Sequence, residues 1–182
     1  MKEDFLAVVQ AKRFLGREFL TWLVHRIEDG DGKFPFDHDV VEVVLGDRVV
    51  LEGGVGDYTE RLTVVGAGDA RPEIGAGLRR GKLIDRAKLA IVRGERRWEL
   101  TLDGGMLTYD GLRCPKLGDT DDATQQDPRA RFENDLFLRL SDTEEVIAIV
   151  DHLFAGFCRA RGAGTWSSKE LPALRAWVDG LR

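Results

Sequence analysis

Three short segments of alternating polar and apolar residues, joined by glycine turns, restrict the fold of this chain most strongly. They span residues 83–92, 97–102 and 106–112, with Gly94 in the first connection and Gly104–Gly105 in the second. Strand-length segments separated by a few turn residues are typical of antiparallel hairpins. The sequence therefore predicts three consecutive antiparallel strands.

Two further β segments are predicted upstream. Residues 40–52 contain two runs rich in β-branched residues on either side of Gly46–Asp47, which is the pattern of a hairpin. Residues 60–65 alternate and predict a third strand. The following Gly66–Gly68 lacks the third glycine and the acidic residue of a dinucleotide-binding fingerprint, so we interpret it as a loop.

Helical periodicity occurs at the N-terminal end and in the middle of the chain. Residues 3–28 carry apolar side chains at steps of three and four, which predicts one long helix with a bend at Gly16. Arg71–Pro72 predicts the start of a short helix, because proline favours the first turn. Gly81 is suited to end that helix as its C-terminal cap.

The C-terminal third is predicted to contain two helices. Gly118–Asp127 is polar and acidic and is interpreted as a loop. Residues 135–140 alternate as a short strand does. Ser141–Glu144 has the form of a capping box, which predicts the start of an aliphatic helix that ends at Gly162. Ser167–Glu170 predicts the cap of a last helix.

These elements predict an α+β fold. We expect an antiparallel sheet, or sheets, of hairpin-connected strands packed against a long N-terminal helix and C-terminal helices. A chain of 182 residues is long enough to bury a core of its own. We expect residues 1–164 to form one α+β domain and residues 165–182 to add a C-terminal helix packed on the same domain.

The composition predicts a cytoplasmic protein. Hydrophobic residues make up 43% of the chain and charged residues 32%, which is typical of globular proteins. No apolar run approaches the roughly 20 residues of a membrane span, and the N-terminus does not have the pattern of a signal peptide. Cys114 and Cys158 lie far apart and are expected to be free thiols.

Positive charge is concentrated in residues 78–97, although the whole chain has a formal net charge of -5. The candidate DNA-binding residues in this stretch are Arg79, Arg80, Lys82, Arg86, Lys88, Arg93, Arg96 and Arg97. The first two also suit the negative end of the preceding helix, and the last three surround a predicted hairpin tip. Lys82, Arg86 and Lys88 are therefore the best candidates for contacts with phosphate.

Strand alternation predicts that Arg86 and Lys88 point the same way as Ile84. The neighbouring strand carries Trp98. Basic residues beside an aromatic ring on a sheet can bind phosphate and stack a base. The alternative is a solvated sheet face with Trp98 in the core, and the sequence leaves both open.

Catalytic and metal-binding motifs are scarce, so we do not favour an enzyme. His25, His38 and His152 have no metal-ligand spacing, and no hydrolase, metalloprotease or phosphate-loop motif occurs. Asp29–Gly32 resembles the start of a calcium loop but lacks its downstream glutamate. We predict no catalytic residue, metal or cofactor. A nuclease is a less favoured alternative, and it would depend on the acids of Asp119–Asp122.

Several segments follow one another in a distinctive order. They are Glu18–Leu23, Gly81–Lys82, Ala87–Leu89, Leu112–Cys114, the acidic loop Gly118–Asp127, and Arg131–Asp135 followed by the helix to Phe157. This ordered set resembles the C-terminal half of the RdgC family, which are bacterial recombination-associated, nucleoid-type DNA-binding proteins. The resemblance covers about residues 15–157.

The resemblance implies a nucleoid-associated protein that binds double-stranded DNA with little sequence preference and modulates recombination by limiting the access of RecA. Such binding rests on phosphate contacts and depends on salt. The family forms a dimeric ring, so the resemblance implies a homodimer or an assembly with a separately encoded N-terminal half. The alternative is a protein–protein interaction or dimerisation module, derived from that family, without DNA binding of its own.

Overall fold

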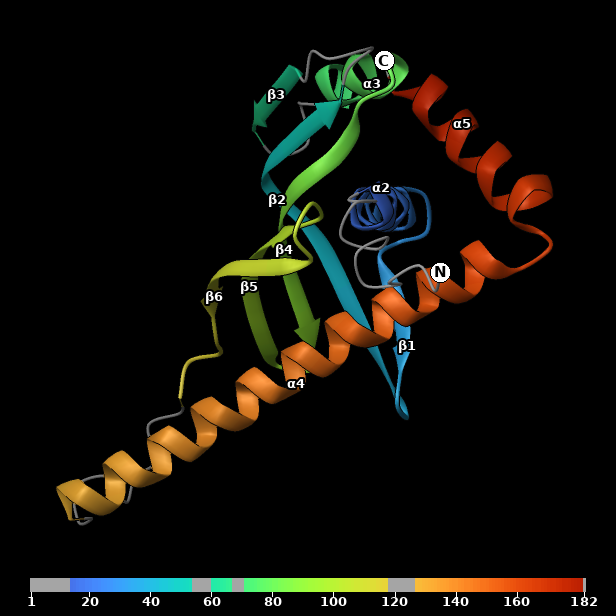
Figure 1. Cartoon of the computed structure of the whole chain (residues 1–182). Helices are drawn as coiled ribbons and strands as arrows, with labels where there is room; N and C mark the ends of the chain where they lie inside the picture. Colours follow the sequence, from blue (N-terminus) through green and yellow to red (C-terminus); the bar gives the residue numbers. More distant parts are fainter. Residues whose placement is uncertain (1–13, 54–59, 67–70, 118–126, 182) are drawn as a thin grey trace, which may run out of the picture.

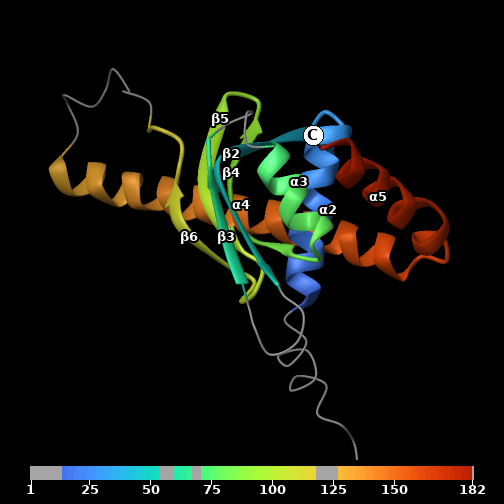
Figure 2. The same cartoon turned by 90° about the horizontal axis from the view of Figure 1, so that it is seen from above.

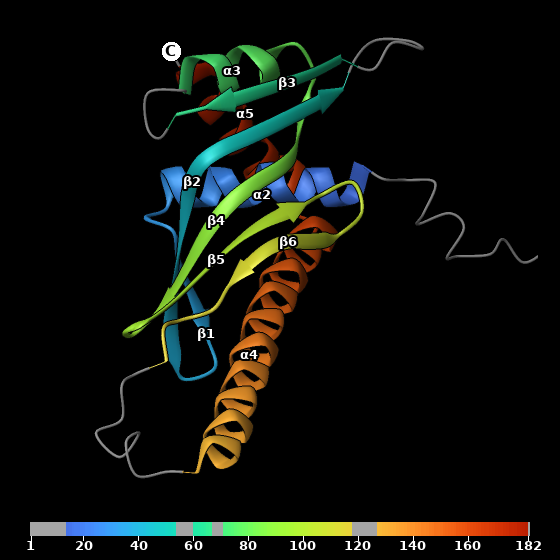
Figure 3. The same ribbon diagram turned by 90° about the vertical axis from the view of Figure 1, so that its left-hand side faces the viewer.

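The chain forms an antiparallel sheet with helices on one of its faces (Figure 1 and Figure 3), in a computed structural model that describes residues 14–53, 60–66, 71–117 and 127–181. The described elements are α2 (Phe14–Asp29), β1 (Lys33–Phe36), β2 (Asp39–Gly53), β3 (Glu60–Val65), α3 (Arg71–Arg79), β4 (Leu83–Arg93), β5 (Arg96–Asp103), β6 (Thr108–Arg113), α4 (Pro128–Gly162), the π-helical turn η2 (Trp166–Glu170) and α5 (Leu171–Gly180). This architecture confirms the predicted α+β class.

The six-stranded sheet is built around β2. One edge of β2 pairs with β4, and the other edge pairs with β1 along its first part and with β3 along its second part. The path β1-β2-β4-β5-β6 confirms the predicted three-stranded meander, and β3 confirms the strand predicted at residues 60–65. The short helix predicted from Arg71 is confirmed as α3.

β2 is one continuous strand, so the hairpin predicted at Gly46–Asp47 is wrong. The pairing between β2 and β4 shifts between Leu45 and Val49, where β2 bulges opposite Lys88. A Cβ atom at Gly46 would lie 2.9 Å from Lys88 O, so the glycine permits the close approach of the two strands. The glycine therefore marks a β-bulge and not a chain reversal.

α2 is buried on all sides. Every residue from Phe19 to His25 is buried, whereas an amphipathic surface helix buries one stripe. The sheet covers one side of α2, and α4 and α5 contact it elsewhere; Figure 1 views α2 along its axis. Thr21 Oγ1 accepts a hydrogen bond from Ile84 N at 3.0 Å, which joins α2 to β4. The part of the predicted helix before Phe14 lies outside the described residues.

α4 is one helix over Pro128–Gly162, so the strand predicted at residues 135–140 and the helix start predicted at Ser141–Glu144 are both wrong. The helix begins where Asp127 caps it, by accepting a hydrogen bond from Arg129 N at 3.4 Å. A cap followed by proline at the first position is a stronger start signal than six residues of alternation. The helix ends at the predicted glycine.

The segment after α4 packs against α2 and α3. The π-helical turn η2 leads directly into α5, and Glu170 makes no side-chain capping bond, so the cap predicted at Ser167–Glu170 is wrong. Trp22 Nε1 donates a hydrogen bond to Glu170 Oε2 at 3.1 Å. Trp177 Nε1 donates one to Glu28 Oε2 at 3.2 Å. Two indole groups thus fix the C-terminal helices on α2.

The two cysteines lie in different parts of the chain and are both free thiols. Cys114 follows β6 and is half-buried, with its Sγ 3.9 Å from Thr143 Oγ1, whereas Cys158 lies exposed on α4. None of the helices within the described ranges combines the length and the apolar character that crossing a membrane requires.

Gly16 provides a close contact between α2 and the turn after β5. A Cβ atom there would clash with Gly104 O and would lie 2.8 Å from Leu107 Cδ2. We predict that Gly16→Ala lowers the free energy of unfolding by about 1–3 kcal/mol through overpacking. The same exchange in an unobstructed helix ordinarily stabilises a protein by roughly 0.5–1 kcal/mol.

Gly156→Ala in α4 is the matched control, because its Cβ would lie 3.9 Å from the nearest atom, Arg159 Nη2. Urea denaturation followed by circular dichroism should show opposite shifts of the midpoint for the two variants. A shift of the same sign and size in both would contradict the close contact at Gly16.

His25 is a buried histidine that packs on Trp177, with 5.4 Å between the ring centroids. Neither ring nitrogen has a hydrogen-bond partner among the described residues. Burial lowers the pKa of His25 below 6.5, and Arg26 acts in the same direction, whereas Asp29 and Glu170 oppose the shift. The folded chain therefore binds this proton more weakly than the unfolded chain does.

The stability that comes from neutral His25 is present above pH 6.5 and is lost as the pH falls from there through the folded-state pKa. We predict that the free energy of unfolding falls as the pH is lowered below 6.5 and that His25→Leu flattens this dependence. His38→Leu is the control, because the His38 side chain is 98% exposed. An unchanged pH dependence in His25→Leu would contradict this assignment.

Candidate functional site

The basic residues between positions 78 and 97 are divided among α3, β4 and β5 and their connections. Within the described part of the chain, all of them except Arg80 have a carboxylate or carbonyl partner. Arg80 is exposed. The charge cluster of the sequence is therefore a set of separate structural contacts in the fold.

Lys82 is buried, at 5% exposure. Its Nζ donates to Gly53 O and to Glu60 O, each at 3.2 Å, and to Glu60 Oε2 at 2.8 Å. The hydrogen bond from Lys82 is the main cause that lowers the pKa of Glu60. All three donors of the ammonium group are thus engaged within the protein. Lys82 joins the start of β4 to the end of β2 and the start of β3.

Arg86 and Lys88 lie on the face of the sheet that points away from α2, but Trp98 lies on the opposite face. Trp98 is fully buried opposite Ile91, and its Nε1 donates to Asp142 O at 3.0 Å. The protein therefore does not form a surface of basic residues beside an aromatic ring. Trp98 belongs to the core, which is the alternative that the sequence left open.

Both outer-face cations have an acidic neighbour. Arg86 Nη2 lies 2.5 Å from Asp103 Oδ2, and Lys88 Nζ lies 3.0 Å from Asp47 Oδ1. The hydrogen bond from Lys88 lowers the pKa of Asp47. Ile84 was predicted on the same face but is fully buried, because the pairing of β2 with β4 shifts beside it.

Arg93 and Arg96 attach the β4–β5 hairpin to α4. Arg93 Nη1 donates to Glu145 Oε1 at 3.0 Å. Arg96 donates to the same carboxylate and, at 2.5 Å, to Asp142 Oδ1. Hydrogen bonds to Asp39 and then to Glu145 raise the pKa of Arg93 above its ordinary value. These two arginines therefore have a structural role in placing α4.

Arg79 and Arg97 also have local partners. Arg79 Nη1 donates to Val178 O and to Leu181 O, each at 2.9 Å, which ties α3 to the end of α5. Arg97 Nη2 lies 3.2 Å from Glu99 Oε1. A DNA duplex that contacted the predicted residues would compete with the protein's own carboxylates and carbonyls at most of them.

The outer face of the sheet contains a hollow of about 260 Å³, which we call the arginine hollow. It lies where β3, β2, β4, β5 and β6 run side by side, on the face that Figure 3 shows in front of the helices. Its lining residues are Arg48, Val50, Arg61, Thr63, Arg86, Thr101 and Asp110. Three guanidinium groups and two hydroxyl groups thus surround one space, and a single carboxylate lies among them.

Buried carboxylates hold two of these arginines in place. Asp103, which fixes Arg86, has a side chain only 6% exposed. Asp85 is 4% exposed at its side chain and lies between Arg17 Nε at 2.6 Å and Arg61 Nη2 at 3.4 Å. The guanidinium groups of Arg61 and Arg86 are therefore oriented by acids beneath the surface.

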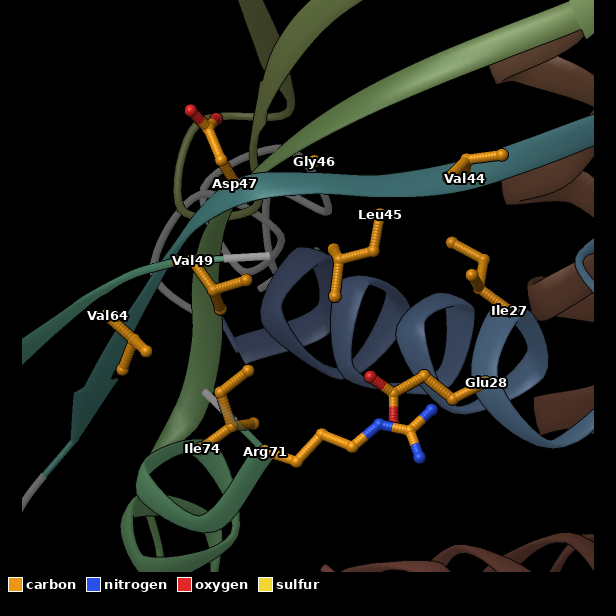
Figure 4. Close-up of a pocket in the computed structure, with 11 residues that line it drawn as sticks. Ile27, Glu28, Val44, Leu45, Gly46, Asp47, Val49, Val64, Arg71 and Ile74 are labelled. Atoms are coloured by element: carbon orange, nitrogen blue, oxygen red, sulfur yellow. The ribbon is translucent and has the colours of Figure 1, made fainter. Parts of the chain in front are cut away.

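A second hollow, of about 240 Å³, lies between α2, β2, β3 and α3 (Figure 4). Its walls are aliphatic, with Ile27, Val49 and Ile74 among them, and Arg71 reaches across it toward Glu28 at 3.6 Å. The described lining contains no histidine, cysteine or hydroxyl group. This space can accept an apolar group, but its described lining has no hydroxyl, thiol or imidazole nucleophile.

No group of three or more potential metal ligands occurs among the described residues. Asp31 and Gly32, in the segment with the form of a calcium loop, adopt positive φ angles of 63° and 68° in the tight connection between α2 and β1. The acids of Asp119–Asp122, on which a nuclease would depend, lie outside the described residues. Ala67 and Gly68, in the segment that was interpreted as a loop, also lie outside them.

The first part of α4, residues 128–141, extends beyond the sheet, as Figure 2 shows on its left side. We call it the α4 arm. Its large exposed apolar side chains are Phe132 (67%), Leu136 (48%), Phe137 (73%), Leu138 (44%) and Leu140 (52%). The buried residues of α4 begin only at Asp142. The arm therefore presents apolar surface to solvent instead of to the core.

Sequence analysis missed both the arginine hollow and the α4 arm. Arg48 was not singled out because a turn was predicted at Gly46–Asp47, directly before it. The strand at residues 60–65 was predicted, but the sequence did not indicate which strand it pairs with. The arm had two usable signals: the Asp127–Pro128 start, and the four-residue spacing of Phe132, Leu136 and Leu140, which places them along one side of a helix.

The comparisons with known proteins give no relative. No family model matches the chain, and no curated protein or solved structure matches it. The relationship to the RdgC family, and the DNA binding that it implies, therefore stay predictions.

Lys82 provides a test of the structural role of the basic stretch. Lys82→Met removes the donor for two backbone carbonyls and the Glu60 carboxylate, and the loss of hydrogen bonds made by a charged group costs about 1.5–3 kcal/mol. We predict a loss of this size in the free energy of unfolding, measured by urea denaturation. Arg80→Met, two positions away and exposed, should change it by less than about 0.5 kcal/mol. Equal effects would mean that Lys82 is not a structural residue.

Proposed function

We propose that this protein is a self-associating protein-interaction domain and that the α4 arm is its contact surface. The observation that carries the proposal is the set of five large apolar side chains, each at least 44% exposed, on residues 128–141. Phe132, Leu136 and Leu140 lie along one side of the helix. Monomeric proteins rarely expose apolar side chains of this size together, and such surfaces are typical of interaction sites. Fully burying one Leu or Phe side chain contributes roughly 1.5–3 kcal/mol.

The length of the arm supports the same proposal. Isolated helices shorter than about 12–15 residues are marginal in water, because most helix stability comes from packing of an apolar face. The arm is anchored near its junction with the rest of α4 by Arg139 Nη1, which donates to Pro115 O at 2.5 Å. Packing against a partner would stabilise the remainder of the arm and remove its apolar side chains from water.

The charges of α4 favour a second copy of the chain, in antiparallel orientation, as the partner. In a pair centred between Leu136 and Phe137, Arg129 of one copy lies level with Glu144 of the other. Asp135 in turn lies nearly level with Arg139. Opposite charges therefore meet in the antiparallel pair, whereas a parallel pair places like charges side by side. Flanking charges set the orientation of paired helices in this way.

Duplex DNA binding, which the resemblance to RdgC implies, remains a second proposal. It is supported by the three guanidinium groups of the arginine hollow. Duplex binders owe most of their affinity to several phosphate contacts. The described cations outside the hollow are largely engaged with acids, and within it Arg61 and Arg86 also contact acids. The interaction domain is therefore the function that the geometry supports better.

The oligomeric state in solution tests the proposed self-association. Analytical ultracentrifugation over a wide range of concentrations should show a dimer. Leu136→Asp should weaken the dimer by at least about tenfold, which corresponds to ~1.4 kcal/mol. Val65→Asp, which alters an apolar residue of β3 that is 71% exposed, is the matched control and should leave association unchanged. A chain that stays monomeric throughout contradicts the proposal.

Charge exchange tests the antiparallel orientation. Arg129→Glu should weaken the dimer, and the double variant Arg129→Glu with Glu144→Arg should restore it, because the pair is re-formed with reversed signs. Circular dichroism confirms that each variant keeps its helices. A double variant that is as weak as Arg129→Glu would exclude this register.

A further inference from the structure

We infer that the arginine hollow on the outer face of the sheet is a binding site for a phosphate group. The hollow has a volume of about 260 Å³, which is enough for a phosphate with some of its substituent. Arg48, Arg61 and Arg86 reach it from three adjacent strands, β2, β3 and β4. This site lies on the sheet, so it is independent of the proposed self-association through the α4 arm.

The donors of the hollow match a tetrahedral oxyanion. Guanidinium groups present planar forks of N–H donors that bind two phosphate oxygens at once. Thr63 and Thr101 add one hydroxyl each, from β3 and β5. Val50 pairs with Thr63 on one side and with Arg86 on the other, so it lies in the middle of the site between the polar groups.

The charges of the lining favour an anion over a cation. Three guanidinium groups and one carboxylate, that of Asp110, line the hollow. Asp85 and Asp103 are nearly fully buried and orient Arg61 and Arg86, and they also offset part of the charge of these two arginines. Arg48 supplies the positive charge that these two acids do not offset. A phosphomonoester or inorganic phosphate fits this balance, whereas a cation or an uncharged sugar does not.

The arginines are also held before any ligand arrives. Arg86 Nη2 is 2.5 Å from Asp103 Oδ2, and Asp103 Oδ1 in turn accepts a hydrogen bond from Met106 N at 2.9 Å. Asp85 is fixed by Arg17 Nε at 2.6 Å and reaches Arg61 from the other side. Binding therefore requires little ordering of Arg86, which lowers its entropic cost.

The same chemistry can be supplied by a small phosphorylated compound or by the backbone of a nucleic acid. The probes are inorganic phosphate and a DNA duplex, each titrated against the full chain with chloride used to match ionic strength. Amide chemical shifts measured by NMR should move on β2, β3 and β4 when phosphate is added. The affinity for phosphate follows from the same titration.

Arg48→Gln is the decisive variant, because Arg48 is an exposed lining residue and its loss leaves no buried acid of the hollow without its partner. We expect at least about a tenfold loss of phosphate affinity, the size that removal of one charge-assisted hydrogen bond gives. Arg97→Gln, on the same face but outside the hollow, is the matched control and should bind phosphate as the unaltered chain does. Thr63→Val should cause a smaller loss.

Phosphate that moves no amide signal beyond the effect of chloride would overturn the inference, as would equal affinities of Arg48→Gln and Arg97→Gln. A duplex that competes with phosphate and loses affinity in Arg48→Gln supports the site and identifies the nucleic-acid backbone as the source of the phosphate. Phosphate binding without competition from the duplex supports the site and assigns it to a small phosphorylated compound.

Discussion

The burial of the middle of α2 on every side is the constraint on which the rest of the structure depends. Seven consecutive residues, Phe19–His25, are buried, so this helix must be covered on every side. The inner face of the sheet covers one side, and Phe157 of α4 covers another, with its ring 5.7 Å from each of the rings of Phe19 and Trp22 and 5.9 Å from that of Trp166. The sheet and the C-terminal helices therefore share one core, with α2 between them.

This arrangement also explains the exposed arm. Only the second part of α4 is needed to cover α2, and its buried apolar residues lie between Val146 and Phe157. The helix is 35 residues long, which corresponds to about 50 Å, so its first part passes beyond the sheet. Arg93 and Arg96 bind Glu145 and Asp142 at the place where α4 passes beyond the sheet. The geometry that completes the core thus carries an apolar helix into solvent.

Sequence reasoning succeeded where local signals and tertiary structure agree. The β4–β5–β6 meander and α3 have glycine or proline at their ends and regular periodicity between, so local chemistry defines them. It failed where tertiary contacts decide the outcome. The Gly46–Asp47 pair has the composition of a turn, yet pairing on both edges of β2 keeps the strand continuous and turns the glycine into a bulge residue. Ser141–Glu144 has the composition of a cap, yet the helix had already begun.

The basic stretch shows why charge counted along a sequence is a weak guide to a binding surface. A cation contributes to the surface potential only through the positive charge that nearby acids do not offset. The fold determines which acids lie near each cation. Lys82, one of the three leading candidates, is the most buried of the described basic residues, whereas Arg48 and Arg61 come from segments with no notable charge in sequence. The bulge and the pairing of β3 with β2 bring those two beside Arg86. A phosphate site in this protein therefore depends on the register of the strands and not on how densely basic residues follow one another along the sequence. The buried acids Asp85 and Asp103 are as much a part of this site as the arginines that they orient.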